Sequence, residues 1–244
     1  MLPGLAAAMV GMSRGPFQFV GSISASVNLG DVSLATTGLT GGTDTQVREG
    51  DYLVVAVADG NTSNAVGVMN DTTFTWSNVA DLYANDDNDC NLSAWVAKAT
   101  TTPPASISAG AGGSTYQSGL MMVFREIETL DATTTTATGI NSNTPNPPAN
   151  TPASSGAVVL IIGGAAKNAG STIKITAAPA NYIGFTAADA IGSTVSSSAG
   201  SMIAAAYRTT GLTPGVVEDP GAFTVSGTET INSWAAITLV LRPA

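Results

Sequence analysis

The sequence predicts an all-β protein, an antiparallel β-sandwich built from two similar halves. Short apolar runs bounded by glycine, proline, asparagine and aspartate recur along the 244 residues, and no segment has the period of a convincing amphipathic helix. Three apolar segments return in the same order: residues 50–58 are similar to 155–163, 91–98 to 201–208, and 119–125 to 236–242. Because a duplicated set of short strands can build one two-layer sandwich, we expect each half to supply strands to both sheets.

The strands of the first half follow from alternating patterns and continuous apolar runs. Residues 17–20 alternate, and 23–32 place their apolar side chains on one face. The apolar run 52–58 has turn residues on both sides, which is typical of a buried strand. Further strands are expected at 92–97 and 120–124, and a short strand or loop edge at 74–76.

Residues 132–155 are rich in threonine and proline and have no hydrophobic period. This composition predicts an extended crossover that joins halves at about 17–131 and 156–244. Two separate domains remain an alternative on length alone. The strands expected in the second half are 157–162, 173–175, 202–207, 223–225 and 234–241, and the helix-permissive segment 185–191 is too short for a stable helix.

The charge composition argues against several classes of partner. Charged residues make up only 10% of the chain, and the net charge is −9. The basic residues form no cluster, so neither a nucleic acid nor an anionic membrane surface is expected to bind. The sequence has no histidine, the commonest general base. Cys90 is the single cysteine, which excludes an intrachain disulfide.

Residues 1–16 form an apolar segment that ends at a Gly-Pro pair. A signal peptide would have a basic residue before its apolar run, and here none precedes it, while Pro3 and Gly4 interrupt it. We therefore favour an assembly arm that packs on a neighbouring subunit. The arm residues expected to make this contact are Leu2, Leu5, Met9, Val10 and Met12.

The densest acidic cluster, residues 85–89, offers Asp86, Asp87 and Asp89 as weak candidate ligands for Ca²⁺. An EF-hand loop that starts at Asp87 would need glycine where Leu92 stands. A solvated hairpin tip is the favoured interpretation, because asparagine and aspartate are frequent in turns. The sequence therefore predicts neither a metal site nor a cofactor, with calcium as the weaker alternative.

Aromatic residues offer a candidate surface for sugar rings. Trp76 and Tyr83 stand just before the acidic cluster and are the candidates for ligand-facing side chains. Trp95 and Trp234 lie within apolar strands, so we expect both indoles in the core.

No catalytic set stands out, and we do not expect an enzyme. Glu126 and Glu128 are spaced like neighbours on one face of a strand, and paired carboxylates serve glycoside hydrolysis. They lack any companion group in the sequence. Neither a Gly-x-Ser-x-Gly elbow nor a phosphate-binding loop occurs. A hydrolase is therefore the least favoured function.

The order of these segments resembles the jelly-roll or β-sandwich domains of structural proteins in tailed bacteriophages and prophages. The similarity covers residues 20–244 and rests on apolar strands, several of which end at a basic residue. The matching segments are 50–57, 94–99, 120–125, 157–162, 204–208 and 235–244. The resemblance brings no catalytic residues with it. It implies a jelly-roll-like component of a virion, such as a capsid decoration, a fibre or spike subunit, or a tail part.

The implied mechanism is assembly with other virion proteins in the host cytoplasm, with the arm docked on a neighbour. A closed homo-oligomer such as a trimer would suit this role. The alternative is a carbohydrate- or host-receptor-binding module at a tail tip or cell surface. In that function Trp76 and Tyr83 would contact the glycan, with Asp86, Asp87 or Asp89 on its hydroxyls or on calcium.

Overall fold

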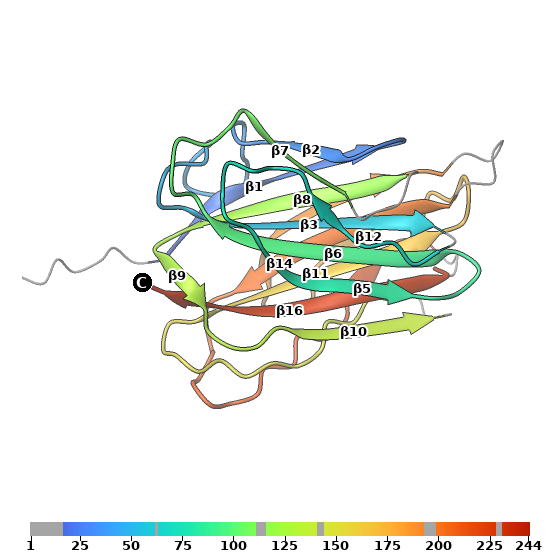
Figure 1. Cartoon of the computed structure of the whole chain (residues 1–244). Helices are drawn as coiled ribbons and strands as arrows, with labels where there is room; N and C mark the ends of the chain where they lie inside the picture. Colours follow the sequence, from blue (N-terminus) through green and yellow to red (C-terminus); the bar gives the residue numbers. More distant parts are fainter. Residues whose placement is uncertain (1–16, 62, 111–115, 141–143, 193–198, 228–230) are drawn as a thin grey trace, which may run out of the picture.

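The computed structural model describes residues 17–61, 63–110, 116–140, 144–192, 199–227 and 231–244. Two large antiparallel sheets pack face to face in this part of the chain (Figure 1). The predicted antiparallel β-sandwich built from two similar halves is therefore confirmed. None of the described residues belong to a helix that is long and apolar enough to cross a membrane.

Each sheet comes almost entirely from one half of the chain. The N-terminal sheet contains, in spatial order, β1 (Gln18–Val27), β8 (Gln117–Arg125), β3 (Tyr52–Asn61), β6 (Asp89–Lys98) and β5 (Ser77–Ala84). The C-terminal sheet contains β10 (Thr135–Ile140), β16 (Ser233–Pro243), β11 (Val158–Lys167), β14 (Gly200–Arg208) and β13 (Ile183–Ala190), and β9 (Ile127–Leu130) pairs with the end of β16. The expectation that each half supplies strands to both sheets is therefore wrong, because strands close in sequence pair with each other, the commoner arrangement.

The two sheets repeat each other residue by residue in the pairing of their central strands. Val54 of β3 lies opposite Val96 and Met122, and Leu160 of β11 lies opposite Tyr207 and Leu239. All six of these side chains belong to the core between the sheets.

This register corrects two of the three alignments made from sequence. Those alignments matched Val54 with Val159, which faces the outer side of its sheet, whereas Leu160 is its true counterpart. The match of 91–98 with 201–208 is displaced by one residue in the same direction, because Leu92 corresponds to Ile203. The match of 119–125 with 236–242 agrees with the structure. A one-residue slip exchanges the two faces of a strand, and continuous apolar runs give no sign of which face is which.

A β-bulge is repeated as well. The pairing of β5 with β6 shifts between Asn78 and Ala80, and the pairing of β13 with β14 shifts between Ile183 and Thr186. Ser77 lies opposite Val96, and Ile183 lies opposite the counterpart of Val96, Tyr207. Counted from these pairs, Val79 and Phe185 occupy the same place in the two bulges.

Two segments expected to lack strands form edge strands. β10 lies within the predicted crossover 132–155, and β13 includes most of the helix-permissive segment 185–191. Each has a single neighbour in its sheet, so neither shows the pattern of a buried strand. The β-branched threonines of β10 favour extended backbone.

Smaller layers cover the outer face of each sheet. The strands β2 (Val32–Ala35), β7 (Ser106–Gly110) and β4 (Val68–Met69) form a sheet over the N-terminal sheet and enclose a second core. The pair β12 (Ile175–Ala177) and β15 (Thr224–Val225) lies over the C-terminal sheet with a third core. Pro145 of the predicted crossover is buried on this outer face, where its carbonyl accepts the amide of Phe223 at 3.0 Å.

The two sheets stack as if related by a two-fold axis through their central strands. β3 packs on β11, and a Cβ atom on Gly164 would lie only 2.9 Å from that of Ala58. β1 lies beside β13, and β5 lies beside β10. In the two strand orders, β10 corresponds to β1, and β13 corresponds to β5. The two sheets therefore face each other as the two subunits of a two-fold symmetric dimer would.

Candidate functional site

A groove of about 370 Å³ opens on the outer face of the C-terminal sheet, between β12 and the edge strand β13. Its lining is formed by Lys174, Ile175, Thr176, Phe185, Ala187, Ala188 and Asp189. The floor is apolar, and an ammonium, a hydroxyl and a carboxylate stand around it. A groove with an apolar floor and few polar groups is the usual form of a small-molecule site.

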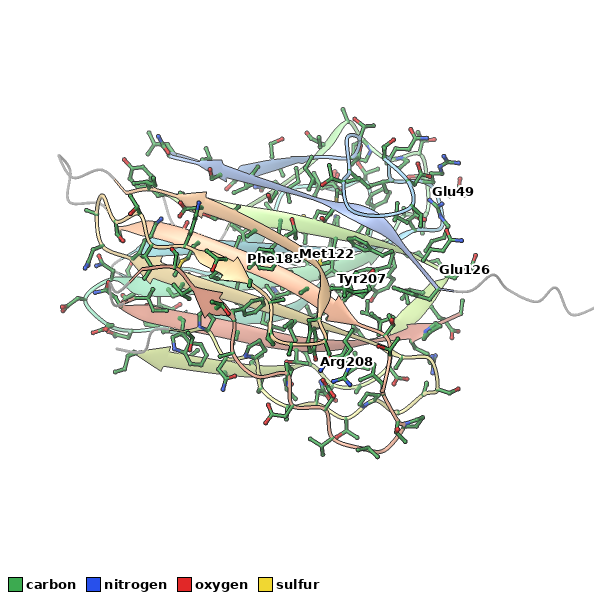
Figure 2. The ribbon with its side chains drawn as sticks, turned by 180° about the vertical axis from the view of Figure 1, so that it is seen from behind. Glu49, Met122, Glu126, Phe185, Tyr207 and Arg208 are labelled. Carbon is green, nitrogen blue, oxygen red and sulfur yellow. The ribbon has the colours of Figure 1, made fainter. Side chains whose placement is uncertain are left out.

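The bulge in β13 positions the aromatic side of this groove. Phe185 occupies the bulge and is 38% exposed. A bulge redirects the side chain of the extra residue away from the regular alternation of the strand. Figure 2 shows Phe185 away from the end of the sandwich that carries Glu49 and Glu126.

A buried ion pair positions the acidic end of the groove. The Lys167 side chain is fully buried, and its ammonium pairs with the carboxylate of Asp189 and donates to the carbonyl of Ile173 at 3.1 Å. The Asp189 side chain is 24% exposed, so it joins the buried ammonium to the groove. Since a buried ammonium is costly without a partner, these contacts hold the loop that follows β11 on the sheet.

The equivalent place on the N-terminal sheet is filled by the chain itself. Asn91 donates to the carbonyl of Ser63 at 3.1 Å and accepts the amide of Ala65 at 3.0 Å. The amide of Gly67 donates to Asp81 at 3.1 Å. A Cβ atom on Gly67 would lie 2.1 Å from the Ser93 hydroxyl oxygen. This loop therefore lies directly on the sheet, where the C-terminal sheet has its groove.

The acidic cluster predicted as a weak calcium candidate closes a turn. Asp89 is buried, and its two carboxylate oxygens accept the Tyr83 hydroxyl at 2.6 Å and the Asp86 amide at 2.7 Å. Asp87 is exposed at the tip of the β5–β6 hairpin. Across the ranges that the structure describes, no three or more acidic, cysteine or histidine side chains gather as metal ligands would. The hairpin interpretation accounts for these contacts.

The two aromatic candidates do not form one surface. Trp76 precedes β5 and Tyr83 lies near its end, which separates them by roughly 20 Å of extended strand. The Trp76 indole donates to Asp71 at 2.8 Å and packs on the outer core. The hydrogen bond to Asp89 raises the pKa of the Tyr83 hydroxyl. The prediction that Trp95 and Trp234 are buried is confirmed.

A second cavity, of about 260 Å³, lies where the chain passes from one sheet to the other. Arg125 at its wall donates to both carboxylate oxygens of the buried Asp51, at 2.7 and 2.9 Å, and these bonds raise the pKa of the guanidinium. Glu126 has a φ of 62°, and it ends β8 before β9 begins. Glu126 and Glu128 therefore do not share a strand face, and Glu128 pairs instead with Arg242 at 3.2 Å.

The groove residues Phe185 and Asp189 escaped prediction. They stand in a segment without a clear period, and their partner Lys167 ends an apolar run. A basic residue at the end of a long buried run was the available signal, because such a residue needs an acidic partner. The predicted arm residues Leu2, Leu5, Met9, Val10 and Met12 lie outside the described residues.

Comparison of the chain with protein-family models, with curated protein sequences and with solved structures returned no significant match.

Proposed function

We propose that this chain is a structural protein of a bacteriophage virion, a capsid decoration, fibre or tail component that acts by assembly with neighbouring subunits and not by catalysis. The observation that carries this proposal is the use of the charged side chains. Asp51 holds Arg125, Asp189 holds Lys167, and Glu218 accepts from Arg208 at 2.7 Å. Each pair ties one part of the chain to another and forms no reactive set.

The chain as a whole is poor in charge, with 10% charged residues, and rich in threonine, serine, asparagine and glycine. Two copies with a net charge of −9 repel each other, so close packing requires faces that are free of charge. A sandwich with three buried cores supplies a rigid body for such contacts. The resemblance to phage structural domains supports the same role.

Purified particles from the source test this function directly. Mass spectrometry is expected to find the chain in the particles at a fixed ratio to the major capsid protein, and gold-labelled antibody is expected to mark the head or the tail. Absence of the chain from purified particles, with the chain present in the lysate, would contradict the proposal.

The groove favours carbohydrate binding as a second function. Phe185 offers an apolar ring face to the C–H side of a hexose, while Asp189 and Thr176 offer hydrogen bonds to its hydroxyls. A glycan array, followed by calorimetry with the best glycan, tests this function. Phe185→Ala is expected to weaken binding at least about tenfold, the size of one lost ring contact. Val79→Ala, in the equivalent bulge, is the matched control and should bind as the unaltered chain does.

A further inference from the structure

Among the strands at the edges of the two large sheets in the described chain, β10 carries the fewest features that prevent pairing with another chain. β5 and β13 each contain a bulge and an aspartate, Asp81 and Asp189 respectively. Bulges and charges are the usual means of protecting a sheet edge. β10 pairs with β16 without any shift in register and carries no charged residue and no proline.

β1 is the counterpart of β10, and the chain covers part of its edge. The loop that contains Thr40, Thr43 and Asp44 forms backbone hydrogen bonds with β1 at 2.9 to 3.0 Å. For residues 135–140 the described chain supplies no backbone hydrogen bond other than the ladder with β16. β10 lies at the lower edge of the sandwich in Figure 1.

The side chains differ between the two edges in the same sense. Ser24 of β1 donates to the carbonyl of Ala187 at 2.8 Å and so ties β1 to β13 across the sandwich. Its counterpart on β10 is Thr136, which is exposed. At the end of β10, Ile140 is 54% exposed, where β1 is followed by the polar Asn28. One side of the sandwich is thus closed, and the other presents an uncharged strand that ends in an exposed apolar residue.

We propose that β10 pairs antiparallel with β10 of a second copy of this chain across a two-fold axis. An open edge specifies its occupant, because its row of amide donors and carbonyl acceptors fits only another extended strand. Each chain carries a net charge of −9, so two copies can pack closely only through uncharged faces. A second copy can pair here because neither β10 strand contains a charged residue. The pairing joins two C-terminal sheets into one continuous sheet.

The two-fold axis determines the register. An axis perpendicular to the sheet keeps every side chain on its own face, so paired residues must both be even-numbered or both odd-numbered. With Thr138 on the axis, it faces the partner's Thr138, and Thr136 faces the partner's Ile140. This register covers the exposed isoleucine with a threonine methyl group, whereas an axis at Ala137 would leave Ile140 beyond the last pair.

This inference deepens the proposed assembly function by naming a partner, and its test uses purified protein without particles. Light scattering after size exclusion measures the mass of the assembly. A protein concentration of about 100 μM lies above the micromolar Kd of a modest protein pair. The unaltered chain is expected at twice its mass of 24.3 kDa. Thr138→Lys and Thr138→Asp should each run as single chains and still unfold in one cooperative thermal transition, because the side chain is exposed. Only the stabilisation that pairing adds should be lost.

A mixture of Thr138→Lys and Thr138→Asp should recover the double mass, because opposite charges then face each other across the axis. Ser26→Lys, at the equivalent exposed position of β1, is the matched control and should stay paired. Lysine also lowers the net negative charge, so dissociation by Thr138→Lys does not follow from general repulsion. A monomeric unaltered chain, an assembly that ignores Thr138→Lys, or equal loss with Ser26→Lys would each overturn the pairing. None of these results bears on whether the chain is found in particles.

Discussion

The two sheets share strand order, register and a bulge, yet they hold the loop after their central strand by different chemistry. The N-terminal sheet uses Asn91 and Asp81, which bind backbone groups of the loop at 3.0 to 3.1 Å. The C-terminal sheet uses one buried ammonium, Lys167, with Asp189 as its partner. The apolar pattern that builds a sheet is thus retained while the polar contacts above it change, and only the C-terminal solution leaves a groove.

The largest effect is expected where the sheets share their core. Phe124 and Leu241 are fully buried counterparts in β8 and β16. Phe124→Ala should lower the free energy of unfolding by about 3–5 kcal/mol and Leu241→Ala by about 2–5 kcal/mol, from lost transfer energy and a residual cavity. Urea unfolding followed by tryptophan fluorescence is expected to show one transition for each variant. A variant that unfolds in two separated steps would mean that each sheet is stable by itself.

The buried ion pair distinguishes the sheets more finely. Asp189→Ala leaves the Lys167 ammonium buried without its carboxylate, and it should cost about 3 kcal/mol, at the low end for broken buried pairs because Asp189 is partly exposed. Tyr83→Phe, at the equivalent position, removes one hydrogen bond and should cost about 1 kcal/mol.

The double variant Lys167→Met with Asp189→Ala is the control for this comparison. It removes both charges and should recover most of the stability that Asp189→Ala loses. Urea midpoints that fall equally in Asp189→Ala and Tyr83→Phe would show that the ammonium finds another partner.

The smallest effect appears only at alkaline pH. Burial raises the pKa of the Cys90 thiol to about 12 from an ordinary 9.0, while its counterpart in β14 is Ser201. The unfolded chain loses the thiol proton first, so the stability from the protonated thiol is complete below about pH 9 and declines toward pH 12. Between these pH values the free energy of unfolding falls by about 1.4 kcal/mol per pH unit because of this thiol.

Cys90→Ser should remove this part of the slope and make the two sheets alike at this position. Tyr52, whose pKa burial raises to about 12, titrates in the unaltered chain and the variant alike. The difference between their urea midpoints at pH 8, 9.5 and 10.5 therefore isolates Cys90. Parallel curves for the two proteins would mean that the thiol does not titrate between the folded and unfolded states.

The sequence predicts the central strands well, because burial on both faces produces the apolar runs of β3, β6, β8, β11 and β16. It misses the edge strands β10 and β13, since β10 consists mainly of threonine and small residues without an apolar run, and β13 is interrupted by a bulge. It also does not predict which sheet each strand joins, because an apolar run is compatible with either sheet. The groove could not be predicted, since it depends on the loop after β11 leaving open a place that the loop after β3 fills.

The position of the last strand has a consequence for synthesis on the ribosome. β16 spans Ser233–Pro243 and lies between β10 and β11, so the C-terminal sheet stays divided until β16 has been made. The N-terminal sheet can form its ladder much earlier, yet its inner face, with Met122 and Phe124, then has no opposing layer. Exposed apolar faces of this kind favour aggregation during folding. The inner face of the N-terminal sheet therefore stays an aggregation-prone surface over the whole interval in which residues 126–243 are made.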